Sequence, residues 1–547
     1  SKPWLTTERY LQVVDKISNH YKEKGRYMHW ELLGGEVTTI PDFEEIIKRI
    51  AHYNSSVTIY TNGSRTTRWW NEAKDYLTGV VITYHPLTMD VQHLYDVVNT
   101  LKDNLILDIN IAGIGGRVKE LSEVADNLRN IFTDGKMQSI YDVNITIKTM
   151  YKKQSNKVII SGLGISGLIT ASLLCKEKIK VECFEPRDIS KFSTDQRTTA
   201  FLNPAIGVFK EIGIWKKIEP FSQPLYEMEI IDAGSKEIAR PASVVFEPKE
   251  VNIENFGYNV PNGILRLELL ARLKKNKNFV LNIGDPIVKH YAFDDNILVR
   301  TAKGKELNGK LLISCEGKNS AIRKREKINT IKTSYNQLAM VFQVSHSKKH
   351  RDRTTEILDV GGPFTIIPLR DSSKQSKSTV VWMDNSDVIN EAYSLKNTEF
   401  NSIISKKSLG IRGNIKLVGK RQKWPVSSQV SKTLISKRTV LIAESAHVMP
   451  PTGAQGLNTS VEDIIALHNI CKKALKNNED IGSDRVLRQY NMKRFHLTGS
   501  KVFGIHLLNK ISMTENIFLR IARKNFLMYL SQSPLLKRTL IKAGLGK

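Results

Sequence analysis

The chain has 547 residues, a formal net charge of +27 at pH 7 and 41% hydrophobic residues. This length is too great for one small domain, so two to four domains are expected. No run of about 18 apolar residues occurs, so no membrane-spanning helix is predicted. The four cysteines lack the spacing of a metal site, and in a chain this long they indicate reduced intracellular thiols.

The charge divides the chain into two parts. Residues 1–150 hold 17 basic and 19 acidic residues, whereas the remainder holds 65 basic and 36 acidic ones. Such a break indicates two units of different origin, and "MYKKQSNKVIISG" at Met150 resembles the start of a second protein. The basic surplus fits either a solvated surface or attraction to anionic lipid or nucleic acid.

Strand-like and helix-like segments alternate through the first part. Such β/α steps imply parallel strands with right-handed crossovers, and they predict a partial β/α barrel over residues 1–150. Functional residues would lie at the carboxyl ends of the strands, which carry Gly34-Gly35-Glu36, Thr61-Asn62-Gly63 and Tyr84-His85-Pro86. The five predicted strands are 27–35, 56–63, 79–86, 105–113 and 141–150.

These strand ends resemble the radical S-adenosylmethionine family, over residues 5–150. In that family a Gly-Gly-Glu after the second strand holds the amino group of S-adenosylmethionine. The family also needs three cysteines, spaced CxxxCxxC, for a [4Fe–4S] cluster, and residues 1–150 contain none. The first part is therefore expected to be a truncated, inactive fragment. A plain β/α domain and residual S-adenosylmethionine binding are the alternatives.

A dinucleotide-binding pattern opens the second part. A predicted strand precedes Gly162, Gly164 and Gly167, a helix follows them, and a second strand ends at Glu185. Gly162 would permit the tight turn, Gly164 the approach of a pyrophosphate, and Gly167 the close packing of helix and strand. The carboxylate of Glu185 would accept both hydroxyls of a ribose.

Three later segments discriminate between NAD and FAD. "STDQRTTAFLNPAIGVFKEIGIW" is expected to open a helix at Asp195 and Arg197, and "GKLLISCEGKNSAIRKRE" is a buried strand that leads into Glu316 and Gly317. "VLIAESAHVMPPTGAQGLN" is a strand that breaks at Glu444 before a stiff turn and a helix. Their order resembles the group A flavoprotein monooxygenases. Within them it is most similar, over about 156–545, to the ubiquinone-biosynthesis hydroxylases of the 2-polyprenyl-6-methoxyphenol hydroxylase type.

The resemblance implies a set of FAD contacts. The glycine loop and Glu185 would hold the pyrophosphate and the adenine-side ribose. Arg197, with Arg266 as a weaker candidate, would lie near the flavin. Backbone N–H groups at a helix start would meet the negative charge of reduced flavin. The remaining implied contacts are Glu316 and Gly317 for FAD and pyridine nucleotide, Glu444 for the ribityl chain, and Pro451, Gly453, Gly456, Leu457 and Asn458 for the isoalloxazine ring.

Two positions depart from the family pattern. Ala443-Glu444 stands where a Gly-Asp pair is usual, and Glu316 stands for an Asp, so each carboxylate is one methylene longer. Ala443 also lacks the backbone freedom of glycine. His447 is expected to be a packed, hydrogen-bonded turn residue rather than a base. The sequence names no catalytic residue and predicts no metal site.

The resemblance implies an α/β fold, with a Rossmann-like FAD-binding domain, a β-sheet substrate domain and C-terminal helices. NAD(P)H would reduce FAD, and O2 would supply the oxygen atom placed on a polyprenylated phenol. The alternatives are a prenyl reductase or halogenase on the same scaffold, or a basic, nonenzymatic membrane or nucleic-acid binder; no nucleic-acid-binding motif is present. The expected parts are the FAD unit at about 156–230, 260–335 and 430–475, the substrate sheet at about 225–258 and 336–425, and the helical C-terminus at 480–547.

The C-terminal 58 residues have helical apolar spacing, with Lys and Arg between the apolar positions. This pattern predicts basic amphipathic helices that lie on anionic lipid. A helical cap packed on the FAD domain is the alternative, and both can hold. The expected location is cytoplasmic and peripheral on the inner membrane, in a possible ubiquinone-biosynthesis complex, with no nucleic-acid partner.

Overall fold

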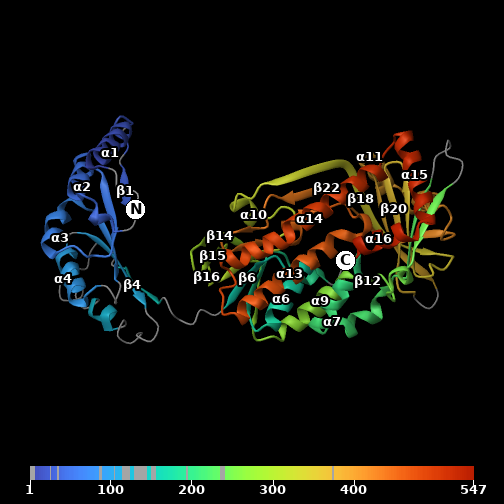
Figure 1. The fold of residues 1–547 in the computed structure, drawn as a ribbon, viewed down its shortest axis with the longest axis horizontal. Coiled ribbons are helices and arrows are strands. Elements are labelled where there is room, and N and C mark those ends of the chain that lie inside the picture. The colour runs from blue at the N-terminus through green and yellow to red at the C-terminus, as the bar shows by residue number, and fades with distance from the viewer. Residues whose placement is uncertain are drawn as a thin grey trace. The chain divides into compact units, whose positions relative to one another are not determined.

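Two compact units make up the chain, Ser1–Gln154 and Ser155–Lys547, and each has a hydrophobic core of its own (Figure 1). The computed structural model describes residues 6–24, 26, 28–33, 36–84, 89–103, 105–113, 123–128, 144–149, 156–192, 195–233, 241–371 and 375–546.

The first unit contains a parallel sheet of order β1-β2-β3-β4-β5, in the β/α succession expected from the sequence. The carboxylate of Glu36 accepts hydrogen bonds from Thr61 Oγ1 (2.8 Å) and Asn62 N (2.6 Å), so it is used within the unit. Gly34, Gly35, His85 and Pro86 lie outside the described residues. So do most of residues 117–132, for which the sequence pattern predicts a helix. The elements are α1 (Thr7–Lys22), β1 (His29–Leu32), α2 (Phe43–His52), β2 (Ser56–Thr61), α3 (Thr67–Ala73), β3 (Gly79–Tyr84), α4 (Val91–Leu101), β4 (Ile106–Gly113) and β5 (Asn144–Thr149).

The second unit begins with a six-stranded sheet of order β13-β7-β6-β17-β24-β23, parallel except at β23. Its strands are apolar on both faces, as a covered parallel sheet requires. Val158 and Ile160 pack under the helices, whereas Ile159 packs on the opposite side with the β14–β15–β16 sheet. The strands of these two sheets are β6 (Lys157–Ser161), β7 (Lys180–Glu185), β13 (Phe279–Ile283), β14 (Ile287–Ala292), β15 (Ile297–Thr301), β16 (Glu306–Gly309), β17 (Leu311–Ser314), β23 (Ile435–Ser436) and β24 (Thr439–Leu441).

Helix α6 (Ile165–Lys176) packs against both α9 (Asn262–Lys274) and α13 (Gln455–Lys476) on this sheet (Figure 1). A short antiparallel sheet, β8-β12-β9, lies beside α7 (Asn203–Ile212). Its strands are β8 (Thr198–Leu202), β9 (Gln223–Pro224) and β12 (Gly257–Pro261). These elements place three loops of the sheet next to one another, which is where the predicted cofactor residues fall.

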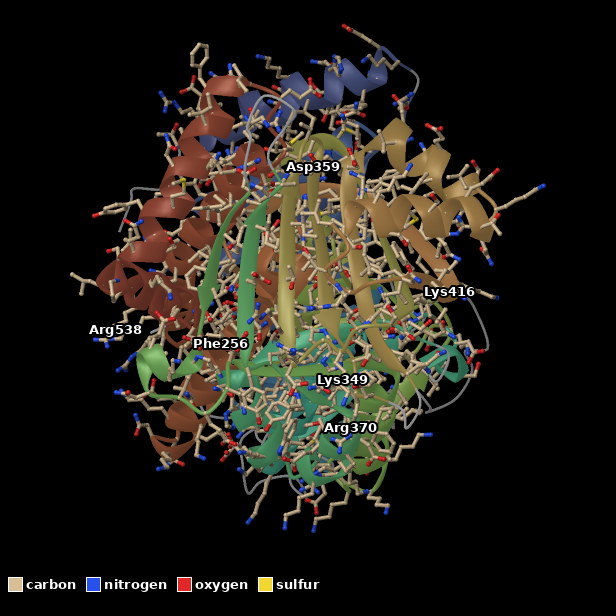
Figure 2. The ribbon with its side chains drawn as sticks, turned by 90° about the vertical axis from the view of Figure 1, so that its right-hand side faces the viewer. Phe256, Lys349, Asp359, Arg370, Lys416 and Arg538 are labelled. Atoms are coloured by element: carbon tan, nitrogen blue, oxygen red, sulfur yellow. The ribbon has the colours of Figure 1, made fainter. Side chains whose placement is uncertain are left out.

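An eight-stranded sheet forms the other half of the second unit, with the order β11-β10-β19-β20-β21-β18-β22-β25. Figure 2 shows its strands running between Asp359 at one end and Lys349 and Arg370 at the other. α11 (Ser386–Ser394) and α12 (Asn397–Lys407) cover one face. The strands are β10 (Glu227–Asp232), β11 (Ala242–Phe246), β18 (Thr330–His346), β19 (Arg353–Asp359), β20 (Gly362–Pro368), β21 (Ser376–Asn385), β22 (Ile415–Ser431) and β25 (His447–Val448).

Three helices end the chain, α14 (Asp484–Ser512), α15 (Ile517–Gln532) and α16 (Pro534–Gly544) (Figure 1). Leu527, Leu530 and Ile541 pack on the eight-stranded sheet through Val244 and Leu358. A parallel, helix-covered sheet joined to a strand-rich sheet and terminal helices confirms the predicted α/β flavoprotein fold.

Candidate flavin site

Three glycines lie in the loop between β6 and α6 and in the first turn of α6, and only one of them has room for a side chain. A Cβ at Gly162 would lie 2.4 Å from the carbonyl oxygen of Cys315, and a Cβ at Gly167 would lie 2.1 Å from that of Gly162. A Cβ at Gly164 would meet no protein atom within 4 Å. Gly162 and Gly167 are therefore needed for the packing of the protein itself, whereas Gly164, at the start of α6, leaves room for a ligand.

Glu185 ends β7 with its side chain buried beside the glycine loop. Its carboxylate accepts hydrogen bonds from Leu163 N (2.7 Å) and from Arg187 Nε (2.8 Å). Burial opposes the charge of this carboxyl, but the bonds from Arg187 and Leu163 prevail and lower its pKa. Glu185 is thus an ionised acceptor within reach of the loop, as a ribose-binding residue must be.

The ends of β17 and β24 bring Glu316, Gly317 and Glu444 together. Glu316 accepts hydrogen bonds from Ser161 Oγ (2.7 Å) and Ser320 Oγ (2.7 Å), which fix it against β6. Gly317 has a φ of +85°, and a Cβ there would lie 3.6 Å from Glu444 Oε2. Glu444 is exposed although its neighbours are buried, and its carboxylate has no hydrogen-bond partner within the described ranges. Of these two acids, Glu316 organises the protein and Glu444 is available to a ligand.

Arg197 and Arg266 meet on one carboxylate, Asp195. Arg197 Nε lies 2.8 Å from Asp195 Oδ1, and Arg266 Nη1 lies 3.0 Å from Asp195 Oδ2. The hydrogen bond that Arg197 donates to Asp195 chiefly raises the pKa of Arg197, and the negative charge of Glu444 adds to this. The sequence correctly placed the two arginines in one region, and Asp195 is the residue that joins them.

The local structure expected at Asp195 and Arg197 was wrong. They do not open a helix: Thr198–Leu202 is strand β8, and the helix α7 begins at Asn203. β8 pairs antiparallel with β12, so a distant partner outweighs the local helical pattern. The correction matters because β8 holds Arg197 beside the eight-stranded sheet, where Thr198 Oγ1 lies 3.0 Å from Thr379 Oγ1.

The turn from β24 to α13 uses left-handed backbone at three positions. Ala443, Gly453 and Ala454 have φ values of +58°, +61° and +54°. The departure noted at Ala443 is therefore real, because alanine there adopts a conformation that suits glycine. Pro451 is exposed and Gly453, Gly456 and Leu457 are half-buried, so the turn presents a surface.

Asn458 has a different role from the one expected. α13 begins at Gln455, so the N–H groups without an intrahelical acceptor are those of the first turn, up to Leu457. The Asn458 side chain is buried and ties α13 to β8, since it accepts a hydrogen bond from Leu202 N (2.9 Å) and donates one to Ala200 O (2.9 Å). Leu457 thus keeps the predicted position at the helix start, whereas the Asn458 amide fixes the helix.

His447 is a packed turn residue, as expected. Its Nε2 lies 2.6 Å from Asp463 Oδ2, and Arg494 Nε lies 2.6 Å from Asp463 Oδ1. Burial works against the charge of Asp463, but His447 and Arg494 lower its pKa. This buried network joins the turn to α13 and α14, so it positions the site without facing it.

Sequence reasoning missed one carboxyl next to the turn, Glu356 of β19. It is 5% exposed, Thr365 Oγ1 lies 3.5 Å from Glu356 Oε2, and the backbone of Gly453 is near enough to lower the pKa of the carboxyl. Burial raises the pKa of Glu356 to about 7, and the two weak partners only partly offset this. The available signal was an acid inside the strand "RTTEILD", which ends just before the glycine pair of "GGPF".

The residues present fit FAD. The open side of Gly164 and the start of α6 suit a pyrophosphate. Exposed Glu444 suits hydroxyls, and the first turn of α13 suits an anionic ring edge. Arg266 Nε and Thr452 Oγ1 are buried without a hydrogen-bond partner among the described residues, and such buried polar atoms ordinarily have one.

Comparisons with known proteins agree with this geometry. The FAD binding domain family matches residues 288–501. The ubiquinone hydroxylase UbiL of Rhodospirillum rubrum is 24% identical over 340 residues, which are 62% of this chain and 77% of that protein. The 3-demethoxyubiquinol 3-hydroxylase of Escherichia coli is 23% identical over 398 residues, 72% of this chain and 99% of that protein.

Solved structures share the fold. The p-nitrophenol 4-monooxygenase PnpA from Pseudomonas putida DLL-E4 has a TM-score of 0.58 at 15% identity, over 71% of this chain and 97% of its own. A variant of HpxO from Klebsiella pneumoniae, complexed with FAD, has a TM-score of 0.56 at 16% identity, over 71% of this chain and 98% of its own. The second unit is therefore an FAD-dependent monooxygenase, similar in sequence to the ubiquinone hydroxylases.

Proposed function

We propose that the chain hydroxylates the ring of a polyprenylated phenol in ubiquinone biosynthesis, with FAD as cofactor and NAD(P)H as electron donor. The observation that carries this proposal is the open glycine loop at Gly164 beside Glu444 and the start of α13, in a chain whose relatives are named as ubiquinone hydroxylases. When bound, FAD would supply the two-electron chemistry that links a nicotinamide donor to O2.

The residues of this chain would bind and orient the cofactor. The N–H groups at the start of α6 would hold the pyrophosphate, and Glu185 would accept the ribose hydroxyls. Glu444 would hold the ribityl chain. The N–H groups of Gln455, Gly456 and Leu457 would stabilise negative charge on the ring.

A membrane surface is the proposed place of the reaction, because a polyprenylated phenol is too apolar to diffuse through water. In the part of the chain that the structure describes, no helix has the length and apolar character to cross a bilayer. The C-terminal helices instead expose apolar side chains, with Phe518 and Leu535 each 78% exposed. Lys and Arg lie between them, as in helices that rest on anionic lipid. We place the enzyme on the cytoplasmic side of the inner membrane.

We propose that these helices serve both expected roles. Their inner face packs on the eight-stranded sheet through Leu527, Leu530 and Ile541, and their outer face carries the exposed apolar residues. The outer set comprises Met492, Leu497, Phe503, Leu507, Leu508, Phe518, Leu519, Ile521, Phe526, Met528, Tyr529, Leu535 and Leu540.

Complementation tests the chemistry. Bacterial strains that each lack one ubiquinone hydroxylase would receive the full chain, and we expect rescue of one strain, which also assigns the ring position. Gly164→Val is the matched negative control, because a Cβ there meets no protein atom within 4 Å and the side chain would enter the proposed pyrophosphate position. Failure to rescue any strain, together with NAD(P)H oxidation that prenylphenols do not stimulate, would refute the substrate class but not FAD binding.

Liposome flotation tests the membrane surface. The holoenzyme should bind vesicles that contain anionic lipid and should dissociate as the salt concentration rises. Phe518→Glu combined with Leu535→Glu should abolish flotation. Phe293→Glu, on the β14–β15 turn and 49% exposed, is the matched control that adds a charge at an exposed aromatic elsewhere. Equal loss in the control variant would show that charge, not the helical face, sets the binding.

A further inference from the structure

One carboxyl projects from the face of the eight-stranded sheet that meets the flavin turn. Glu356 on β19 pairs with Ile230 on β10 and with Thr365 on β20. Residues directly opposite one another in a sheet point to the same side, so these three share a face. The next residue, Ile357, points to the other face, where it packs in the core beneath α11 and α12.

Glu356 has little to bind within the protein. Thr365 Oγ1 is at 3.5 Å, and the backbone of Gly453 is near enough to lower the pKa of the carboxyl slightly. No ion pair reaches Glu356 in the ranges that the structure describes. Buried carboxyl groups are ordinarily paired or strongly hydrogen-bonded, and this one, at 5% exposure, keeps acceptor capacity that its protein partners leave unused.

The charged groups on the elements around Glu356 are engaged elsewhere. On β10, Asp232 is bound by Arg523 of α15 at 2.7 Å. Glu229 pairs with Thr355 across the strands and so points to the opposite face, where Arg353 lies 3.4 Å away. Neither β20 nor the turn 450–455 contains a charged residue. Burial is therefore the main influence on the pKa of Glu356.

We infer that Glu356 binds the ring hydroxyl of the phenol substrate and takes its proton. This inference rests on the proposed function. It follows from the position of the carboxyl, which lies between the substrate sheet and Gly453, a residue of the turn that would pass the isoalloxazine ring. A phenol placed between the turn and this face of the sheet would meet Glu356 as its acidic partner.

The proton transfer from the phenol to Glu356 breaks one O–H bond and forms another. The O–H bond of the phenol breaks, its electron pair stays on the phenol oxygen, and a new O–H bond forms on the carboxylate. The net charge of the buried site does not change, so no second ion needs to enter. The pKa of Glu356, raised by burial to about 7, narrows the gap to a phenol at about 10. The phenolate ring is more electron-rich than the phenol and accepts an electrophilic oxygen more readily.

The first test compares Glu356→Gln with Asp359→Asn in the holoenzyme. Glutamine keeps the size and one acceptor but takes up no proton. Asp359 lies at the end of the same strand (Figure 2), with its side chain 39% exposed, and serves as the matched control. With a short-chain prenylphenol at pH 7, we expect kcat to fall about 10²- to 10⁴-fold in Glu356→Gln and to change less than about twofold in Asp359→Asn. FAD content should be equal in all three proteins.

The second test measures binding of the phenol as a function of pH. Binding of the prenylphenol to the wild-type holoenzyme, followed by the change in flavin absorbance, should tighten as the pH rises through about 7, because the ionised carboxylate accepts the hydrogen bond of the phenol more strongly than the neutral acid does. In Glu356→Gln the affinity should not change with pH in this range. This titration needs no turnover, and the wild-type measurement stands even if the variant does not fold.

The outcomes separate the two claims. A wild-type enzyme that binds the phenol more tightly above about pH 7 but never hydroxylates it refutes the proposed function alone. Hydroxylation by Glu356→Gln at the wild-type rate refutes the inference alone, and so does wild-type binding of the phenol that does not change between about pH 5 and about pH 9. Loss of the pH dependence in Glu356→Gln, with hydroxylation slowed and FAD retained, supports both.

Discussion

Two strand-to-helix turns form the cofactor site, and they reach the same end by different means. The turn from β6 to α6 has glycine at each position where the family pattern requires it, and only Gly162 of its glycines has a positive φ. The turn from β24 to α13 places alanine in left-handed backbone at Ala443 and Ala454. The first turn relies on small residues, whereas the second relies on its surroundings.

Those surroundings hold the second turn from several sides. Arg323 Nη1 donates a hydrogen bond to Ser445 O at 2.8 Å, and His447 is fixed by Asp463 at 2.6 Å. β25 joins the turn to the eight-stranded sheet, and Asn458 joins α13 to β8. Strained backbone persists where neighbouring structure over-determines it, so this turn tolerates residues that the first turn would not.

The largest expected effect is a loss of stability when the turn from β6 to α6 is disrupted. Gly167→Ala places a Cβ 2.1 Å from the backbone oxygen of Gly162, which has no freedom to move away. We expect the free energy of unfolding to fall by about 3 kcal/mol or more, as for overpacked cores, measured by urea denaturation of the apoprotein. Gly499→Ala in α14 is the control, because its Cβ meets nothing within 4 Å and the helix gains about 1 kcal/mol. Equal effects in the two variants would contradict the close packing.

The second turn is tested through its buried neighbour Glu356. Because burial raises the folded-state pKa to about 7, above an ordinary value of 4.5, the folded protein holds a proton that the unfolded chain has lost. Stability is therefore retained below pH 4.5 and falls as the pH rises through 7. We expect Glu356→Gln to gain about 3 kcal/mol over wild type between pH 4.5 and pH 8. A stability difference that is independent of pH would show that the carboxyl titrates normally.

A slightly smaller effect separates folding from binding in the first turn. Gly164→Val adds a side chain where the protein itself has no atom within 4 Å. The apoprotein should unfold within about 1 kcal/mol of wild type, while FAD affinity should fall at least about 100-fold, or about 2.7 kcal/mol. Flavin absorbance of the purified and reconstituted proteins measures this. If the variant retains flavin, the pyrophosphate does not bind at this loop.

The smallest expected effect concerns the left-handed backbone of Ala443 in the turn from β24 to α13. Ala443→Gly removes a buried methyl group and adds backbone entropy to the unfolded chain, but it also relieves a φ of +58°. Ala446→Gly makes the same deletion at a φ of −94° in the same turn. We expect Ala443→Gly to be about 1–2 kcal/mol more stable than Ala446→Gly by urea denaturation. Equal stabilities would mean that the left-handed alanine carries no strain.

The glycine loop was predictable because everything that defines it is local. The strand, the turn, the helix and Glu185 occur within one βαβ unit, and the spacing alone fixes which residue meets which. The other two carboxylates at strand ends, Glu316 and Glu444, followed from order and resemblance. In the structure they do lie together, although Glu316 is taken up by Ser161 and Ser320.

What the sequence did not reveal depends on distant partners. Strand β8 replaces an expected helix because β12 pairs with it. The amide of Asn458 is used by Ala200 and Leu202 because α13 packs beside that strand. Glu356 is near the flavin turn because of Gly453, a residue far along the chain. Such contacts have no periodic or spacing signal, so a single sequence does not disclose them.

The ion pair between Arg523 and Asp232 has a consequence for how the enzyme would meet a bilayer. Arg523 of α15 binds Asp232 of β10 at 2.7 Å and also donates to the carbonyl oxygens of Ile511 and Ser512, all within the protein interior. The outer face of α15 is thus fixed to the sheet that carries Glu356. A lipid-bound enzyme would keep one tilt relative to the membrane plane, and its encounters with substrate would become a two-dimensional search at constant orientation.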